Sequence, residues 1–326
     1  MEVINSFSND AADSNRSLGQ LERAASWHYP TFLRRALPPA VRGALRELRR
    51  RVLTYYAFRH LPRHKEFDQS PGDALATASL SIIVPVHDAP EVTRRCLTSL
   101  QKYAPKAEII LVDDASKLEE AKKLLEDFSN RNSWKLIRHL EPLGHSQACG
   151  AGASVATRRF LCLLNSDTVA TPWCWRPIVQ AFEDNPKIGV AGPSTSYSGN
   201  LQTLHLAFST RSYLNDSQIC EYARRLLGEY PDTILIDLPW VSGFAFFIRR
   251  SLWEQLGGFD RNLPDYGNDV ELCRRLQGIG YRVVYVRNSY IHHFAGASYS
   301  KMFAADSLSA RGRVALDYIQ NKFSRH

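Results

Sequence analysis

Short apolar runs alternate with amphipathic stretches through most of the chain. Nearly unbroken apolar runs occupy residues 80–86 (LSIIVPV), 108–112 (EIILV) and 160–164 (FLCLL). Runs of this kind are typical of parallel strands that are buried on both faces of a sheet. Between them, apolar residues recur at helical spacing, as in residues 92–100. The pattern predicts an α/β protein with an open, mostly parallel sheet flanked by helices.

Weaker signals extend the alternation in both directions. Residues 136–140 (LIRHL) predict another strand, and residues 146–157 predict the helix that follows it. Residues 241–260 predict a strand and then a short helix, and residues 266–286 predict a helix and then a strand. Residues 201–235 show no clear period, so we expect an insertion there.

The N-terminal part of the chain differs from the rest. Residues 1–25 are polar, have no signal-peptide core and are expected to be disordered. Residues 41–55 combine helically spaced apolar positions with many arginines. This helix either packs on the main domain or lies on anionic lipid, and its modest apolar face favours packing. We expect an extension over 1–78, a main domain over 79–300 and a helical tail over 301–326.

Charge and cysteine content narrow the class of protein. The chain has 326 residues, a net charge of +8 and a pI of about 9.2, which suits an anionic partner. The arginines concentrate in one N-terminal helix and do not alternate with aromatic residues, so we expect no nucleic-acid partner. The six cysteines form no CxxC pair, which argues against a zinc ribbon. We predict a cytoplasmic protein, with the basic helix as a candidate contact to the inner face of the membrane.

Polar residues follow three of the predicted strands directly. His87 follows the first, Asp113 and Asp114 end the second, and Asn165 and Asp167 follow FLCLL. A single Asp at such a position is most often a helix cap or a turn residue. Several acidic residues at the carboxyl edge of one parallel sheet instead indicate a ligand site. A metal-bound phosphate site is the candidate.

Two further groups come from the C-terminal half. Asn268 and Asp269 stand at the start of a predicted helix, where capping alone could explain them. His292 and His293 follow a predicted strand. Structural histidines and metal ligands are both open interpretations of that pair.

The motifs SIIVPVHD, VDDAS, LLNSDT, VSGFAFFIRR with GGFD, NDVELCRRL and HHFAGAS resemble, in this order, those of family-2 glycosyltransferases with the GT-A fold. The resemblance is nearest to the rhamnosyltransferase-like members and covers roughly residues 79–300. It implies inverting, metal-dependent transfer of a sugar from a nucleoside diphosphate to a hydroxyl acceptor. It further implies a UDP- or dTDP-sugar donor and a glycan or lipid-linked acceptor, in glycan or surface polysaccharide synthesis.

The resemblance also assigns roles to matching residues. Asp167, in the NSD counterpart of the family's D-x-D motif, would bind Mn²⁺ or Mg²⁺, with His293, or in second place His292, as a further ligand. Asp269 would be the general base. The remaining matches would contact the donor: Pro85, His87, Asp113, Asp114, Asn165 and Gly243.

Departures from the family pattern leave other functions open. Asn165 replaces the first acid of D-x-D and Asn268 replaces the Glu before the base, while Pro142 and Gly150 stand where the family usually has Asn. A catalytically weakened sugar-nucleotide-binding or scaffold protein on the same fold is therefore an alternative. A nucleotidyltransferase is disfavoured, because VPVHDAPEV lacks a glycine-rich, basic triphosphate loop.

Overall fold

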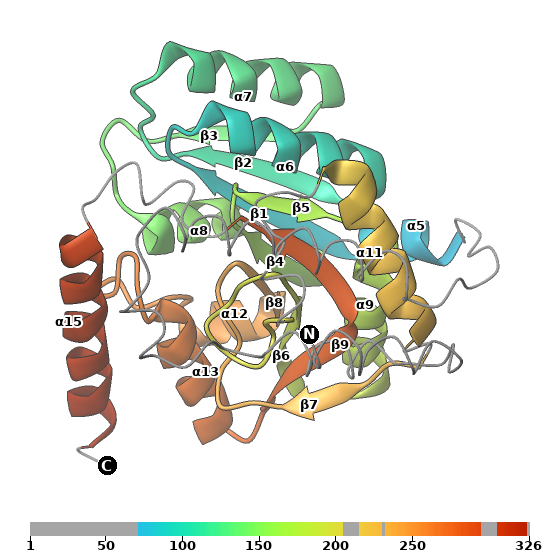
Figure 1. Ribbon diagram of the computed structural model, residues 1–326. Helices are drawn as coiled ribbons and strands as arrows, with labels where there is room; N and C mark the ends of the chain where they lie inside the picture. The colour runs from blue at the N-terminus through green and yellow to red at the C-terminus, as the bar shows by residue number, and fades with distance from the viewer. Residues whose placement is uncertain (1–70, 205–214, 230–231, 295–304, 325–326) are drawn as a thin grey trace, which may run out of the picture.

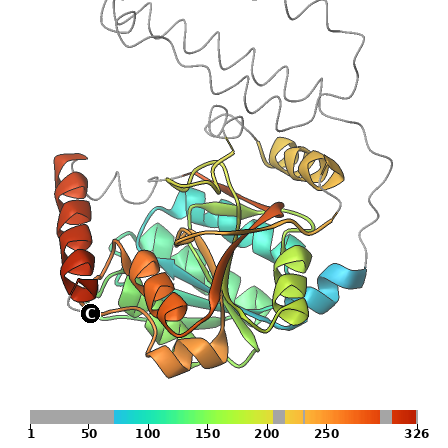
Figure 2. The same ribbon diagram turned by 90° about the horizontal axis from the view of Figure 1, so that it is seen from below.

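The protein is described by a computed structural model covering residues 71–204, 215–229, 232–294 and 305–324. The basic helix expected at 41–55 lies outside these ranges. Within them, no helix combines the length and the apolar character needed to cross a bilayer. The chain forms a twisted sheet with helices on both faces (Figures 1 and 2).

Four parallel strands make up one half of the sheet. They are β1 (Leu80–Val86), β2 (Glu108–Asp113), β3 (Lys135–Arg138) and β4 (Phe160–Leu164), in the spatial order β3-β2-β1-β4. Every residue of β1 and β4 is buried, which explains their unbroken apolar sequences. Because the strands are parallel, their carboxyl ends lie along one edge.

The other half of the sheet is mixed. Strand β8 (Ala245–Arg249) lies antiparallel between β4 and β6 (Ile188–Ser194), and β9 (Arg282–His293) lies parallel to β6. Two short strands pair antiparallel with β9, namely β5 (Thr168–Ala170) and β7 (Leu235–Asp237). Strand β5 begins at the residue after Asp167, so the pairing of β5 with β9 carries the end of β9 to the NSD motif.

Apolar side chains on the two faces of the sheet form two hydrophobic clusters. On one face the cluster is completed by α6 (Pro90–Tyr103), α7 (Glu119–Asn132) and α9 (Trp175–Asp184). On the other it is completed by α8 (His145–Ser154), α12 (Arg250–Leu256) and α13 (Asn268–Gly278). Helices α5 (Pro71–Ala78) and α11 (Asp216–Glu229) pack at the margin, against α9 and β9 respectively. All six cysteines are free thiols, and five of them are buried.

Helix α15 (Ala305–Phe323) stands beside α13 in both views (Figures 1 and 2). Its buried residues Ala315 and Ile319 cluster with Leu263, in the loop before α13. Gly267, the N-cap of α13, has φ +75°, and a Cβ there would lie 2.8 Å from the Cδ1 atom of Ile319. A glycine is therefore needed for both the turn and the close approach of α15.

Some element boundaries differ from those predicted. Strand β3 ends at Arg138, and α8 begins at His145 and ends at Ser154. The histidine pair does not follow a strand but completes β9, because the backbone stays extended to pair with β5. Buried Asn288 and Ser289 interrupt the apolar sequence of β9, so its full length was not predicted. Part of the unassigned region 201–235 forms α11 and the start of β7.

Candidate active site

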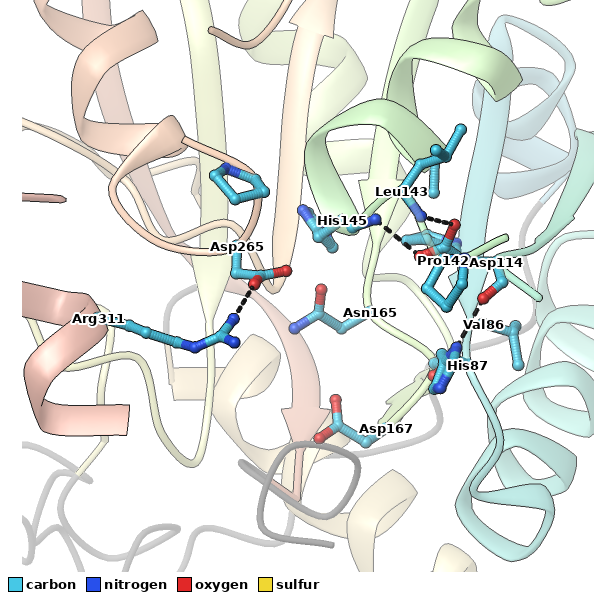
Figure 3. Close-up of a pocket in the computed structure, with 15 residues that line it drawn as sticks. Val86, His87, Asp114, Pro142, Leu143, His145, Asn165, Asp167, Asp265 and Arg311 are labelled. Carbon is cyan, nitrogen blue, oxygen red and sulfur yellow. Dashed lines mark hydrogen bonds and ion pairs between the residues drawn. The ribbon is translucent and has the colours of Figure 1, made fainter. Parts of the chain in front are cut away.

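A cavity of about 360 Å³ opens at the carboxyl edge of the parallel strands (Figure 3). The ends of β1 and β4, the segment before α8, the loop before α13 and helix α15 all contribute to its wall. Of the residues predicted for the site, five line it: Pro85, His87, Asp114, Asn165 and Asp167. Four are not among its described lining residues: Asp113, Gly243, Asp269 and His293.

Asp114 builds one wall of the cavity by holding the segment before α8. Its carboxylate accepts the backbone N–H groups of Leu143 and Gly144, each at 2.9 Å, and contacts Nδ1 of His139 at 2.7 Å. Gly144 has φ +86°, and a Cβ at that position would lie 3.1 Å from Pro264. The Asp114 backbone carbonyl accepts a hydrogen bond from Nδ1 of His87 at 2.6 Å (Figure 3). The side chain of Asp114 therefore shapes the wall through backbone contacts.

The neighbouring Asp113 has a different environment. Its side chain is buried, accepts the backbone N–H of Ser116 at 2.9 Å and lies 3.4 Å from Nε of Arg138. The contact with Ser116 braces the turn between β2 and α7, and the contact with Arg138 links the end of β2 to β3. A similar turn contact is made by Asp88, whose carboxylate accepts the N–H groups of Lys117 and Leu118 at the start of α7.

Asp167 and His293 form the most distinctive pair near the cavity. The Nδ1 atom of His293 lies 2.8 Å from the carbonyl oxygen of Tyr197, which can only accept, so Nδ1 carries a proton. Nε2 of the same ring lies 3.2 Å from Oδ1 of Asp167. In a neutral imidazole the lone pair of Nε2 would face a carboxylate oxygen, and that arrangement is repulsive unless a proton or a cation lies between them.

His292 does not share this environment. Successive side chains of a strand point to opposite faces, and the His292 ring is fully buried with Nδ1 2.8 Å from the hydroxyl of Tyr290. The ring of His293 instead stacks on Phe244, with centroids 5.1 Å apart. Between the two histidines, the geometry favours His293 as a ligand.

The donor set near Asp167 suits a divalent cation that shares its ligands with a substrate. A carboxylate oxygen and an imidazole nitrogen are compatible with Mn²⁺, whereas Mg²⁺ prefers oxygen alone. Across the described ranges, no group of three or more His, Cys, Asp or Glu side chains could hold a metal ion. A cation at Asp167 and His293 would therefore need further ligands of another kind, such as amide, hydroxyl or backbone oxygens or the oxygens of a substrate.

His145 and Asn165 line the floor of the cavity. Burial lowers the pKa of His145, and the negative charge of Asp265 and a hydrogen bond with the side chain of Asn165 only partly offset that effect. Asn268 donates to Oγ of Ser146 at 2.8 Å and so ties α13 to the start of α8. The substitution of Asn for the family's Glu at position 268 thus has a local structural use, since the amide supplies a donor that a carboxylate lacks.

Asp269 lies at the start of α13, beside Gly243. Its Oδ2 accepts the N–H of Gly243 and its Oδ1 accepts the N–H of Val270, both at 2.8 Å. Burial raises the pKa of this carboxyl, against the opposing effect of these backbone donors. Phe244, next to Gly243, stacks on His293 and accepts the backbone N–H of Asn165 at 2.8 Å. Asp269 therefore contacts Gly243, and the next residue, Phe244, contacts His293 and Asn165. Asp269 is not itself among the described lining residues.

Three ionisable lining residues were not predicted from the sequence. Asp265, in the loop before α13, forms an ion pair of 2.9 Å with Nη1 of Arg311, from α15 (Figure 3). The motifs do not include either residue, and an arginine on an exposed helix face carries no sequence signal of its own. His145, at the first position of α8, was also missed, although its place after the predicted strand at 136–140 could have suggested it.

The parallel strands, the mixed extension through β8 and the cavity at the carboxyl edge together form a GT-A fold. The family described as Glycosyl transferase family 2 matches residues 81–257, more than half of the chain, and the protein belongs to this family. A solved structure of GalNAc-T7 with UDP, GalNAc and Mn²⁺ shares the fold, with a TM-score of 0.52 and 18% identity over 79% of this chain and 53% of that one.

Relatives of known name are similar over parts of the chain. The O-antigen biosynthesis protein RfbC of Myxococcus xanthus is 28% identical over 232 residues, which cover 68% of this chain but 18% of RfbC. An N-acetylglucosaminyl-diphospho-decaprenol L-rhamnosyltransferase of Mycobacterium tuberculosis is 41% identical over 54 residues, covering 17% of this chain and 18% of the relative. The chain thus spans less than a fifth of the length of either relative.

Proposed function

We propose that the protein transfers a sugar from a nucleoside diphosphate donor to a hydroxyl acceptor, with inversion and with a divalent metal held by Asp167 and His293. The contact between Nε2 of His293 and Oδ1 of Asp167 carries the proposal. The Nδ1 atom of His293 donates to a backbone carbonyl, and metal-binding histidines are commonly oriented by such a hydrogen bond from the ring nitrogen that does not bind the metal. The other ring nitrogen, Nε2, lies 3.2 Å from Oδ1 of Asp167.

A bound Mn²⁺ or Mg²⁺ would neutralise the charge that develops on the leaving diphosphate. The protein's own contribution is to hold the donor against the carboxyl edge of the sheet. Pro85 and His87 at the end of β1 and Asn165 after β4 line the space next to Asp167. Asp114 contributes indirectly, by holding the wall at Leu143 and Gly144.

Asp269 is proposed to take the proton from the acceptor hydroxyl. A hydroxyl is a poor nucleophile, and a positioned carboxylate is the group that activates it. The raised pKa of Asp269 makes it a stronger base than an exposed aspartate. The backbone N–H groups of Gly243 and Val270 fix its orientation. A single positioned base is the arrangement expected for direct displacement with inversion.

A UDP- or dTDP-sugar is the proposed donor, and a glycan or lipid-linked acceptor in surface polysaccharide synthesis is the proposed partner. The acceptor is supported by the similarity to an O-antigen biosynthesis protein and to a rhamnosyltransferase acting on a lipid-linked sugar, as their names state. The nucleotide of the donor rests on the resemblance of the sequence motifs. The matches cover less than a fifth of each relative, so both assignments are proposals for this chain.

A thermal-shift series tests the proposal. The protein is heated with UDP, dTDP or GDP, each with Mn²⁺, with Mg²⁺ or with EDTA. Specific binding raises the melting temperature with the logarithm of ligand concentration, and we expect at least one diphosphate to do so more strongly with metal. The best donor is then assayed for turnover. Failure of all three nucleotides would reject the proposal, and binding without turnover would favour the scaffold alternative.

A further inference from the structure

We propose that Arg311, on the C-terminal helix α15, is a donor-binding residue that contacts the phosphate groups of the nucleoside diphosphate. The inference rests on the proposed function and adds to it a residue outside the region matched by the family, which ends at residue 257. Figure 3 shows the Arg311 side chain extending from α15 toward Asp265 and Asn165 at the cavity.

The charges around the cavity are the first argument. Asp114, Asp167 and Asp265 line it, and Arg311 is the sole lysine or arginine among the described lining residues. A nucleoside diphosphate brings several negative charges into this space. A metal at Asp167 would offset only part of that charge, whereas a guanidinium is well suited to phosphate oxygens because its N–H donors form a planar fork.

The second argument is that Arg311 is held in place. Lys322, near the end of the same helix, contacts Asp260 at 2.6 Å and the fully buried Glu271 at 2.8 Å. Ile319 packs into the space left by Gly267. These contacts fix α15 against the loop that carries Asp265, so Arg311 is presented to the cavity by a docked helix.

Asp265 explains how the guanidinium is positioned before the donor binds. Its side chain is 14% exposed, whereas that of Arg311 is 44% exposed. A guanidinium has five N–H donors, so it can keep a contact with one carboxylate and also bind a phosphate oxygen. The pair therefore places a cation at the cavity and neutralises a carboxylate that would otherwise repel the donor.

The test measures dissociation constants by titration calorimetry in EDTA, which removes any metal contribution. The probe is whichever of UDP, dTDP and GDP binds the wild type most tightly, followed by the matching monophosphate and nucleoside. Arg311→Gln should weaken diphosphate binding roughly 10- to 100-fold, the range for a hydrogen bond to a charged group. The loss should be smaller for the monophosphate and absent for the nucleoside, and Arg311→Lys should lie between the two. Arg313→Gln, an exposed change of equal charge on α15, is the matched control and should bind like the wild type.

The double variant Arg311→Gln/Asp265→Asn separates contact from neutralisation. If Arg311 binds phosphate, the double variant stays weak. Full recovery of affinity in the double variant would overturn the proposal, because Arg311 would then only offset Asp265. An equal loss for the nucleoside, or wild-type affinity in Arg311→Gln with an unchanged melting temperature, would also overturn it. If the wild type binds no diphosphate with or without metal, the proposed function fails, and this inference fails with it.

Discussion

Nε2 of His293 lies 3.2 Å from Oδ1 of Asp167, at the point where β5 and β9 pair at the edge of the sheet. The ring is turned into this position by its Nδ1–H, which donates to the carbonyl of Tyr197, and by stacking on Phe244. The fold thus brings a ring nitrogen and a carboxylate oxygen close together from two residues that are 126 positions apart in the sequence. Three of the predictions below concern the chemistry around this pair and Asp269.

Asp167→Asn should remove the metal-dependent part of nucleotide binding. The amide keeps the shape of the side chain but lacks the charge that a hard divalent cation prefers. We expect the gain in diphosphate affinity on adding Mn²⁺ to disappear, while affinity in EDTA is kept or slightly increased. Calorimetric titration with and without Mn²⁺ measures this difference. Asp184→Asn, an exposed change at the end of α9, is the control, and a persistent Mn²⁺ effect in Asp167→Asn would contradict the assignment.

Asp269→Asn should lower turnover by about 10²–10⁴-fold if this carboxylate is the base. Donor affinity should change little, because Asp167 and the cavity wall remain intact. Both carboxylate oxygens accept backbone N–H groups, so the amide nitrogen would face a donor. An unsatisfied contact of this kind costs about 1–3 kcal/mol of stability. The assay therefore runs well below the measured melting temperature, and near-normal turnover would exclude Asp269 as the base.

The role proposed for Asp269 also predicts how kcat/KM depends on pH. The pKa of Asp269 lies above the ordinary carboxyl value of 3.8, because burial disfavours its charged form. A base acts only when deprotonated, so kcat/KM should fall as the pH drops through this raised pKa. The profile is recorded at saturating metal, over a pH range in which the protein remains folded. An acid limb no higher than that of an exposed carboxyl would argue against this assignment.

Two glycines of α8 offer a matched pair for stability. A Cβ at Gly152 would lie 2.4 Å from the Cγ2 atom of Ile83, in the tightly packed interface with β1. Gly152→Ala should destabilise the protein by about 1–3 kcal/mol through overpacking. At Gly150 a Cβ would meet nothing within 4 Å, so Gly150→Ala should stabilise by about 0.5–1 kcal/mol through helix propensity. Denaturant unfolding measures the change in the free energy of unfolding for both variants. Equal changes would contradict the described packing of α8.

Lys322→Gln should loosen α15 and lower the melting temperature by a few degrees. Burial would raise the pKa of Asp260, but hydrogen bonds from Lys322 and its other donors outweigh burial and bring it to about 2. A depressed carboxyl pKa contributes stability above the unfolded value near 3.8, and that contribution is lost as the pH falls through about 2. The difference in melting temperature between the wild type and the variant should therefore narrow as the pH falls through this range. A difference that stays constant with pH would show that the ion pair is not its source.

Much of the fold could be predicted from the sequence because burial leaves a local pattern. The apolar runs of β1, β2 and β4 predicted parallel strands, and the start of α13 at Asn268 was predicted from its helical period. The polar residues at the ends of these strands were predicted to lie near one another, because parallel strands bring their carboxyl ends to one edge. In each case a few consecutive residues contain the information.

Contacts between distant residues were decided only by the tertiary structure. The side chains of Asp113 and Asp114 separate into a turn brace and a wall anchor because successive residues face opposite sides. The choice between His292 and His293 depends on the register of β9 against β5. Arg311 meets Asp265 only because Lys322 and Ile319 dock α15 beside α13. Local periodicity reports which face of an element is buried, but it carries no information on which distant element packs there, and at this cavity that packing decides which charges meet.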